Sequence, residues 1–174
     1  MWRGNRVIFI SIGILIAAIM VLTLLNRTDA VLFRALQENR EFLLKLDGET
    51  VAIVSLRDIM DMQPVEFTTR LATSITKPRE ARLRGVELRL IYEALDIDVS
   101  AASLFAIRGL DNYFSPLTFM EVETADKVYI CFSMDGEILQ ALKDGGWGPF
   151  LLVIRGELFA QRWCKYVEEI DAQV

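Results

Sequence analysis

The chain has 174 residues, of which 53% are apolar, and a formal net charge of −5 at pH 7. It contains no histidine, which excludes a Ser-His-Asp triad, a histidine-ligated haem or zinc and an imidazole proton shuttle within this chain. If Arg3 and Arg6 at the N-terminus are left out, the rest of the chain has 17 of the 19 basic residues and all 24 acidic residues, a net charge of −7. This balance argues against a nucleic acid as partner.

The run from Val7 to Leu25 carries no charge and is apolar apart from Ser11, Gly13 and Thr23. At a rise of about 1.5 Å per residue, its roughly nineteen residues span about 28 Å, close to the thickness of the hydrocarbon core of a bilayer. We therefore expect a transmembrane helix. A cleavable signal peptide is the alternative, but its apolar region is usually shorter, and residues 28–30 match the cleavage pattern poorly.

The basic residues that precede this run predict its orientation. Arg3, Arg6 and the amino terminus come before it, so the positive-inside rule favours a cytoplasmic N-terminus. The expected organisation is a transmembrane anchor at 1–26, a helical connector at 27–41 and a domain at 42–174. We expect a single-pass protein of the bacterial inner membrane whose C-terminal domain lies in the periplasm.

Within the domain, strands outnumber helices. Alternating or β-branched apolar runs predict strands at 42–46, 51–54, 65–71, 105–107, 113–116, 127–134, 149–154 and 162–167. Helical spacing predicts short helices at 56–60, at 88–95 and from Leu117 onward. Asp47-Gly48 and Asp135-Gly136 supply the chemistry of tight turns, and Ser55 is the expected N-cap of the first short helix. These elements predict an α+β, mostly β architecture.

The most polar stretch of the chain is 73–84. It holds Lys77, Arg79, Arg82 and Arg84. A solvated loop accounts for this composition. The functional interpretation is an anion or partner site, because loops carry function and this loop is locally basic on an acidic domain. We take Arg79, Arg82 and Arg84 as candidate partner-binding residues.

Trp147 and the two cysteines are further candidates. Trp147 lies in the glycine-rich segment KDGGWG, where it either packs its own loop against the core or faces a partner, and we include it among the candidate partner-binding residues. Cys131 and Cys164 both fall in predicted strands. They are expected either to pair across neighbouring strands in an oxidising compartment or to be small buried hydrophobes.

A series of motifs from Phe42 to the C-terminus carries a family resemblance. In order, the motifs are LKLDGETVAIVSLRDIM, VEFTTRL, RGVELRLIYEALDI, GLDNYFSPLTFMEV, VYICFSMDGEIL, GPFLLVIRG and RWCKYVEEIDAQV. Together they resemble the molybdopterin-binding domain of sulfite-oxidase-type oxidoreductases, and most closely its short, exported, stand-alone versions. The resemblance implies an α+β, mostly β fold that holds molybdenum through a pterin dithiolene and one cysteine thiolate. Here that fold is preceded by the one predicted transmembrane helix.

The chain departs from the family at the metal ligand. The resemblance places the ligating cysteine just after the strand VEFTTRL. That region reads TTRLATS, with Ala72 near the expected place, and neither Cys131 nor Cys164 is at the matching position. The histidines that the family uses for the pterin phosphate and the substrate are missing as well. If molybdopterin binds, the residues that would contact it are Thr68, Thr69, Arg70, Asn112 and Tyr113. The threonines also fit a strand edge, and 111–112 also fits a side-chain-capped turn.

Two functions follow from this comparison. The one we expect is a membrane-anchored, extracytoplasmic binding or accessory module, without cofactor, for a protein partner in a membrane or signalling complex. The alternative is an active, molybdenum-cofactor-dependent oxidoreductase with a non-cysteine metal ligand. A third possibility is that the transmembrane helix itself drives assembly through Gly13 and Ala17. The sequence identifies no catalytic residue and no metal ligand.

Overall fold

The computed structural model describes residues 2–72, 77–110 and 113–174, and leaves undescribed the side chains of residues 2–8 and 24–30. The chain divides into two compact units, Met1–Ala35 and Leu36–Val174. Helix α1 (Trp2–Asn39) contains the whole N-terminal apolar run and continues through most of the predicted connector. The residues of the predicted anchor and most of those of the predicted connector thus lie in one helix.

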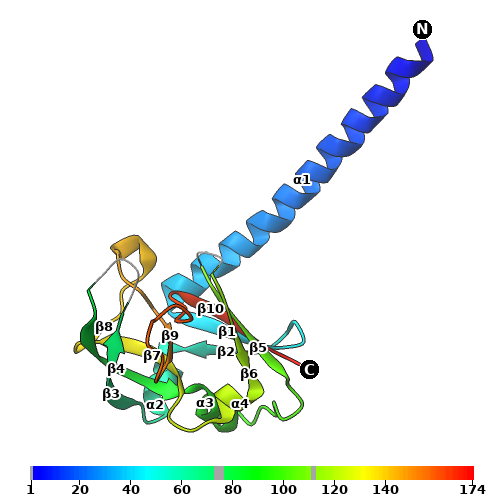
Figure 1. Cartoon of the computed structure of the whole chain (residues 1–174). Coiled ribbons are helices and arrows are strands. Elements are labelled where there is room, and N and C mark those ends of the chain that lie inside the picture. Colours follow the sequence, from blue (N-terminus) through cyan, green and yellow to red (C-terminus); the bar gives the residue numbers. More distant parts are fainter. Residues whose placement is uncertain (1, 73–76, 111–112) are drawn as a thin grey trace. The chain divides into compact units, whose positions relative to one another are not determined.

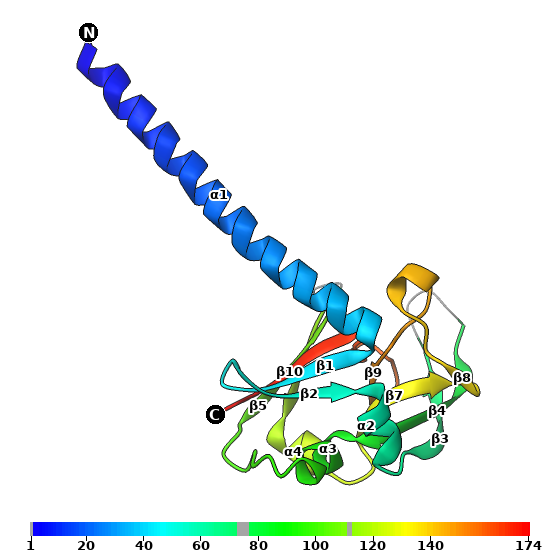
Figure 2. The same ribbon diagram turned by 180° about the vertical axis from the view of Figure 1, so that it is seen from behind.

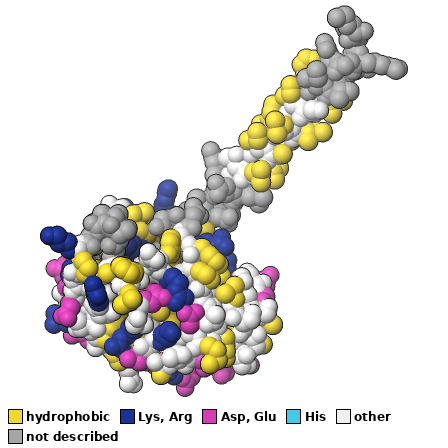
Figure 3. Space-filling model, viewed as in Figure 1, with side chains coloured by type: hydrophobic (Ala, Val, Ile, Leu, Met, Phe, Trp, Pro, Cys, Tyr) yellow, Lys and Arg dark blue, Asp and Glu magenta, His cyan; other side chains and the backbone are white. Residues whose placement is uncertain are grey.

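The described part of α1 in the first unit has an apolar surface. Its exposed large side chains are Phe9, Ile10, Ile12, Ile14, Leu15, Ile16, Ile19, Met20, Val21, Leu22, Val31 and Leu32. Figure 3 shows these apolar groups along the helix. Among the described residues, however, no helix combines the length and the hydropathy that a membrane span requires. The transmembrane anchor stays a prediction.

The second unit contains two five-stranded sheets within the described residues (Figures 1 and 2). The first sheet is made of β1 (Glu41–Leu46), β2 (Glu49–Ser55), β5 (Leu104–Gly109), β6 (Phe114–Thr118) and β10 (Val167–Gln173). Its order is β2-β1-β10-β5-β6, so the last strand of the chain lies at the centre. Strand β10 pairs parallel to β1 and antiparallel to β5.

The second sheet is built around β7. Its strands are β3 (Val65–Leu71), β4 (Arg79–Glu87), β7 (Val128–Met134), β8 (Glu137–Ile138) and β9 (Leu151–Ile154). The order is β3-β4-β7-β8, and β9 also pairs with β7. The side chains of β7 are buried except at its last residue, as its apolar sequence predicted for an interior strand.

The short helices gather at one end of the domain in both views (Figures 1 and 2). They are α2 (Leu56–Asp61), α3 (Leu88–Ala94) and α4 (Phe119–Glu123), and a 3-10 turn, η1 (Leu142–Asp144), lies further along the chain. Ser55 caps α2 as predicted, in a capping box with Asp58. Thr118 and Glu121 form the same box on α4, which begins two residues after the predicted start at Leu117.

Turns and aromatic packing join these elements into one core. Asp47-Gly48 and Asp135-Gly136 have positive φ and connect β1 to β2 and β7 to β8, as predicted. Between the sheets, Phe42 of β1 meets Phe150, just before β9, with ring centroids 4.9 Å apart in an edge-to-face contact. The core therefore forms where the two sheets face each other.

The predicted loop at 73–84 is wrong in its second half, because Arg79 begins strand β4. From Glu80 to Gly85 the strand alternates: Ala81 and Leu83 are buried, whereas Glu80, Arg82 and Arg84 are exposed. These three charged residues form its outer face. Residues 73–76 lie outside the described part of the chain.

The predicted strand at 162–167 is also wrong. Only an isolated bridge between Leu151 and Lys165 forms there, and Tyr166 then takes a left-handed conformation with φ of 55° before β10 begins. Cys164 is therefore not in a strand. Cys131 and Cys164 are both buried and are not joined in a disulfide. The expectation that they are small buried hydrophobes is therefore confirmed.

Gly85 provides a test of how tightly β4 packs on β7. A Cβ added there would lie 2.4 Å from the carbonyl oxygen of Ile130 and 2.7 Å from the Cα of Cys131, both backbone atoms of β7. We expect Gly85→Ala to lower the free energy of unfolding by about 2–4 kcal/mol, measured by urea denaturation of the full chain.

The matched control is Gly156→Ala. Gly156 has a φ of +84° and open space around it, so only backbone strain opposes the methyl group, with a cost of about 1 kcal/mol. Equal losses in the two variants would show that β4 and β7 are not in close contact at Gly85.

Candidate functional site

Ala72 lies near the position at which the resemblance implies a cysteine. It follows β3 directly and is 1% exposed, and its backbone carbonyl accepts a hydrogen bond of 2.9 Å from the backbone N–H of Ala160. A segment between β9 and β10 therefore closes against the end of β3. We call residues 157–162 the covering loop.

The covering loop is held from the first sheet as well. Ser115 of β6 donates a hydrogen bond of 2.7 Å from its Oγ to the carbonyl of Arg162. The Tyr113 hydroxyl donates to the carbonyl of Gln161. The Arg162 guanidinium forms ion pairs with Glu157 in the loop and, at 2.8 Å, with Glu121 of α4. The covering loop thus ties the end of β3 to the edge of the first sheet.

The Glu121 carboxylate is the most strongly perturbed acid in this arrangement. A hydrogen bond from the Arg162 side chain is the main cause, and donors from Thr118 add to it, so the pKa of Glu121 falls to about 2 although partial burial opposes the shift. The same pair raises the pKa of Arg162. Both groups therefore stay charged over the physiological range, which suits a structural clamp rather than proton transfer.

The structure describes four of the five predicted cofactor contacts. Thr68 and Arg70 are exposed on the outer side of β3, whereas Thr69 turns toward the interior. Asn112 lies outside the described residues, and Tyr113, just before β6, uses its hydroxyl to hold the covering loop. Their contact with a cofactor stays a prediction.

The described cysteines do not supply the missing ligand. Cys131 is fully buried in β7, and burial raises the pKa of its thiol far above neutral pH, which opposes formation of the thiolate. Cys164 is also buried. Among the residues that the structure describes, no group of three or more histidine, cysteine, aspartate or glutamate side chains is placed to hold a metal ion. The donor set therefore does not fit a cysteine-ligated molybdenum.

Of the predicted partner-binding arginines, Arg82 and Arg84 share the outer face of β4, and Arg79 is the exposed first residue of the strand. We call Arg79, Arg82 and Arg84 the basic strand face. Arg79 forms a 2.8 Å ion pair with Asp135, and Arg82 lies 3.7 Å from a Glu66 carboxylate oxygen. The Arg84 guanidinium instead lies 5.9 Å from the ring centroid of Phe132.

The basic strand face is accordingly interspersed with acidic groups rather than purely basic. The backbone N–H of Arg82 and the Arg79 guanidinium both bond to Asp135 and lower the pKa of its carboxyl. Figure 3 shows a similar mixture of basic and acidic side chains over the face of the domain in view.

Trp147 packs against the domain core, half-buried. The Lys165 ammonium lies 3.6 Å from its ring centroid, and the Tyr166 hydroxyl donates a 2.9 Å hydrogen bond to the carbonyl of neighbouring Gly146. These contacts fix the loop that carries Trp147. A contact with a partner stays a prediction.

No protein-family model matches the chain, and no curated protein matches it. Among solved structures, the sulfane dehydrogenase SoxCD from Paracoccus pantotrophus is similar, with a TM-score of 0.62, 14% identity and coverage of 79% of this chain. The match spans 39% of the SoxCD chain. At this identity the likeness shows the fold alone, a mixed α+β, mostly β domain compatible with a distant sulfite-oxidase-like fold.

The covering loop and its clamp were missed from the sequence. The pattern Thr118-x-x-Glu121 is a capping-box signature, and it predicts both the start of α4 and the role of Glu121 there. The pairing of Glu121 with Arg162, across 41 positions, had no local signal.

The clamp predicts a specific loss of stability in acid. Because the folded pKa of Glu121, about 2, lies below its ordinary value of 4.5, its stabilising effect is complete above about pH 4.5 and is lost as the pH falls toward 2. We expect Glu121→Gln to lower the free energy of unfolding by roughly 1–2 kcal/mol at pH 6 and by much less near pH 2.

Urea denaturation of the full chain at a series of pH values measures this difference. Glu123→Gln is the control, because Glu123 is an exposed carboxylate on the same helix. A constant difference between wild type and Glu121→Gln from pH 6 to about pH 2 would contradict the clamp.

Proposed function

We propose that the chain is a membrane-anchored domain of sulfite-oxidase-like fold that serves as a binding or accessory module and not as a molybdenum enzyme. The observation that supports this most directly is the buried Ala72 near the position of the expected thiolate, in a region without cysteine. The methyl group of alanine cannot ligate a metal, and its carbonyl is already engaged by the covering loop. The chain therefore combines this fold with an alanine in the region where a metal-ligating cysteine is expected.

The proposal includes an N-terminal anchor and a periplasmic domain. The exposed apolar side chains of α1 in the first unit support the anchor, since water-exposed helices normally carry polar groups on at least one face. The basic residues ahead of the apolar run support the orientation.

The basic strand face is the proposed contact with a protein partner in a membrane or signalling complex. Arg84 is its central element, because within the described residues it forms no ion pair, whereas Arg79 and Arg82 face carboxylates of this chain. An acidic group on the partner would pair with Arg84.

The alternative of an active molybdenum oxidoreductase is supported by the likeness in fold to a dehydrogenase. It would require a metal ligand other than cysteine and a pterin site near Thr68, Thr69, Arg70 and Tyr113. The outward direction of Thr68 and Arg70 does not favour it.

A charge reversal tests the partner contact. We expect Arg84→Glu to reduce co-purification of the partner, cross-linked to the full chain in its own host membranes, by about five- to tenfold. Reversal of Arg79 and Arg82 as well should abolish it. The control is Arg57→Glu, an exposed residue on α2. Unchanged recovery in the triple variant would exclude this face as the contact.

A further inference from the structure

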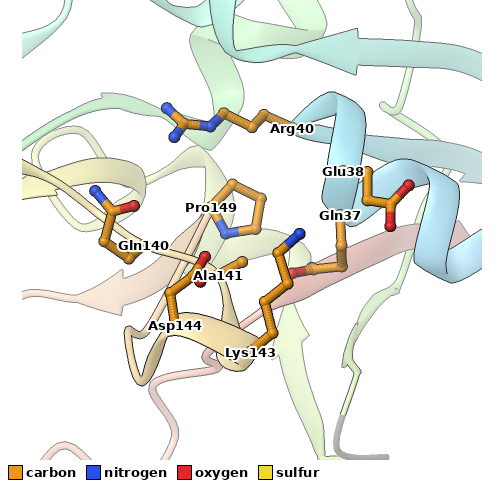
Figure 4. Close-up of a pocket in the computed structure, with 8 residues that line it drawn as sticks. All are labelled: Gln37, Glu38, Arg40, Gln140, Ala141, Lys143, Asp144 and Pro149. Carbon is orange, nitrogen blue, oxygen red and sulfur yellow. The ribbon is translucent and has the colours of Figure 1, made fainter.

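A polar cavity near the end of α1 has balanced charges. Its volume is about 140 Å³, and two acidic and two basic side chains line it: Glu38, Asp144, Arg40 and Lys143. In Figure 4 the side chains of Glu38 and Arg40 point to opposite sides. The cavity therefore selects neither an anion nor a cation.

Strand β3 is an open edge of the second sheet. It comes first in the order β3-β4-β7-β8, and in both views it lies on the side of the domain opposite β5 and β6 (Figures 1 and 2). Its seven residues, Val65–Leu71, pair with β4 without a bulge. Within the described residues, the backbone of β3 forms hydrogen bonds only with β4. The backbone N–H and C=O groups on its other side form a template for a further strand.

The other edges in the described part of the two sheets are protected. Strand β2 has a bulge in its pairing with β1, and β6 contains Pro116 and is held by the covering loop. Strand β8 has two residues, and β9 is bridged to Lys165 on the side away from β7. Bulges, prolines and short strands are the usual means of preventing edge pairing. Strand β3 has none of these three features.

The sequence of β3 is complementary to itself. Glu66 and Arg70 each lie two residues from Thr68, and all three side chains are exposed on the outer face of the strand. When two copies of β3 pair antiparallel about Thr68, each Glu66 faces Arg70 of the other copy, and the two threonines face each other. Opposite charges and threonine pairs at such directly opposed positions stabilise antiparallel strands. The half-exposed Val65 then lies opposite Leu71, an apolar pair.

The two charges also select this register. A shift of the centre to Phe67 or Thr69 places no charge opposite another charge, and a shift by two residues places Glu66 opposite Glu66 or Arg70 opposite Arg70. Within the described residues, Arg70 forms no ion pair, and the contact of Glu66 with an arginine of β4 is 3.7 Å long and exposed. Both charges are thus accessible to a second copy.

We propose that the chain forms a two-fold symmetric dimer in which β3 pairs antiparallel with β3 of a second copy, centred on Thr68. The interface is isologous, and the second sheets of the two copies become one continuous sheet. About six to eight backbone hydrogen bonds would join the copies. Because one strand edge is a small interface, we expect a dissociation constant of roughly 1–50 µM.

This dimer does not rest on the proposed partner contact. It uses the edge of β3, whereas the partner contact uses outward side chains of β4, and Arg84 is not part of the pairing. Either proposal can therefore fail without the other.

A cysteine at the proposed symmetry axis tests the pairing. In the full chain, purified in a mild detergent, Thr68→Cys places two thiols on residues with Cα atoms about 4.5–5.5 Å apart, a separation that a disulfide spans. We expect mild oxidation with copper phenanthroline to convert more than about half of this variant to a dimer on a non-reducing gel. The wild type should stay monomeric on the gel, because its two cysteines are buried.

Glu66→Cys is the matched control on the same exposed face of β3. In the proposed register its two thiols would lie about 14 Å apart along the strands, so it should not cross-link. Equal cross-linking of Thr68→Cys and Glu66→Cys, or none in either, would overturn the proposal.

Charge reversal tests the register without cysteines. Glu66→Arg alone gathers four positive side chains around the axis, and Arg70→Glu alone gathers four negative ones, so each variant should dimerise at least about tenfold more weakly than wild type. An equimolar mixture of the two variants again opposes unlike charges, and it should form a heterodimer with an affinity within about threefold of wild type. Sedimentation analysis in detergent measures all three.

Glu93→Arg, an exposed substitution on α3, is the control and should leave dimerisation unchanged. A wild-type chain that is monomeric at about 200 µM would refute the dimer. Undiminished dimerisation of both single variants, or a mixture that associates no better than either variant alone, would refute the pairing of β3 about Thr68.

Discussion

The pairing of β10 between β1 and β5 is the constraint on which the domain depends. The last strand of the chain lies beside the first, so the first sheet is complete only when the whole sequence has been placed. Strand β10 also brings acidic side chains into the interior. Glu169 meets Lys45 at 2.6 Å and Arg108 at 3.2 Å, and Asp171 accepts a hydrogen bond of 3.0 Å from the backbone N–H of Gly48. Because a buried carboxylate is tolerated only with such partners, these contacts fix both the register and the neighbours of β10.

The placement of β10 in turn positions the segment before it. Strand β9 belongs to the second sheet and β10 to the first, so residues 155–166 must cross from one sheet to the other. The covering loop lies in this crossing, where Ala160 meets Ala72 and Arg162 meets Glu121. Tyr166, at its end, donates a hydrogen bond to Gly146 in the loop that carries Trp147. The surface near Ala72 and the loop that carries Trp147 therefore border the same crossing segment, although they are made of different residues.

The parts of the fold that could be predicted were those with local signals. Strand β3 was placed at its observed bounds, the aspartate-glycine turns were found, and the Ser55 cap was recognised from its own neighbourhood. Strands β4 and β10 were missed because their charged residues resemble a loop or a solvated tail. Both segments form strands because of contacts with other parts of the chain. Strand β4 pairs with β3 and β7, and Lys45 and Arg108 neutralise Glu169 of β10. The candidate site shows the same limit. The absence of cysteine near Ala72 was visible in the sequence, but the clamp on the covering loop depends on contacts between distant segments.

Molybdenum and pterin content most directly tests whether this domain keeps the fold without the cofactor. The full chain would be produced in a host that makes and exports molybdenum cofactor, purified as folded protein, and measured by elemental analysis together with pterin fluorescence. A fold closed by β10 and by the covering loop over Ala72 predicts folded protein with molybdenum and pterin far below one equivalent. Near-stoichiometric amounts of both would contradict it and would require a substitute ligand near Ala72.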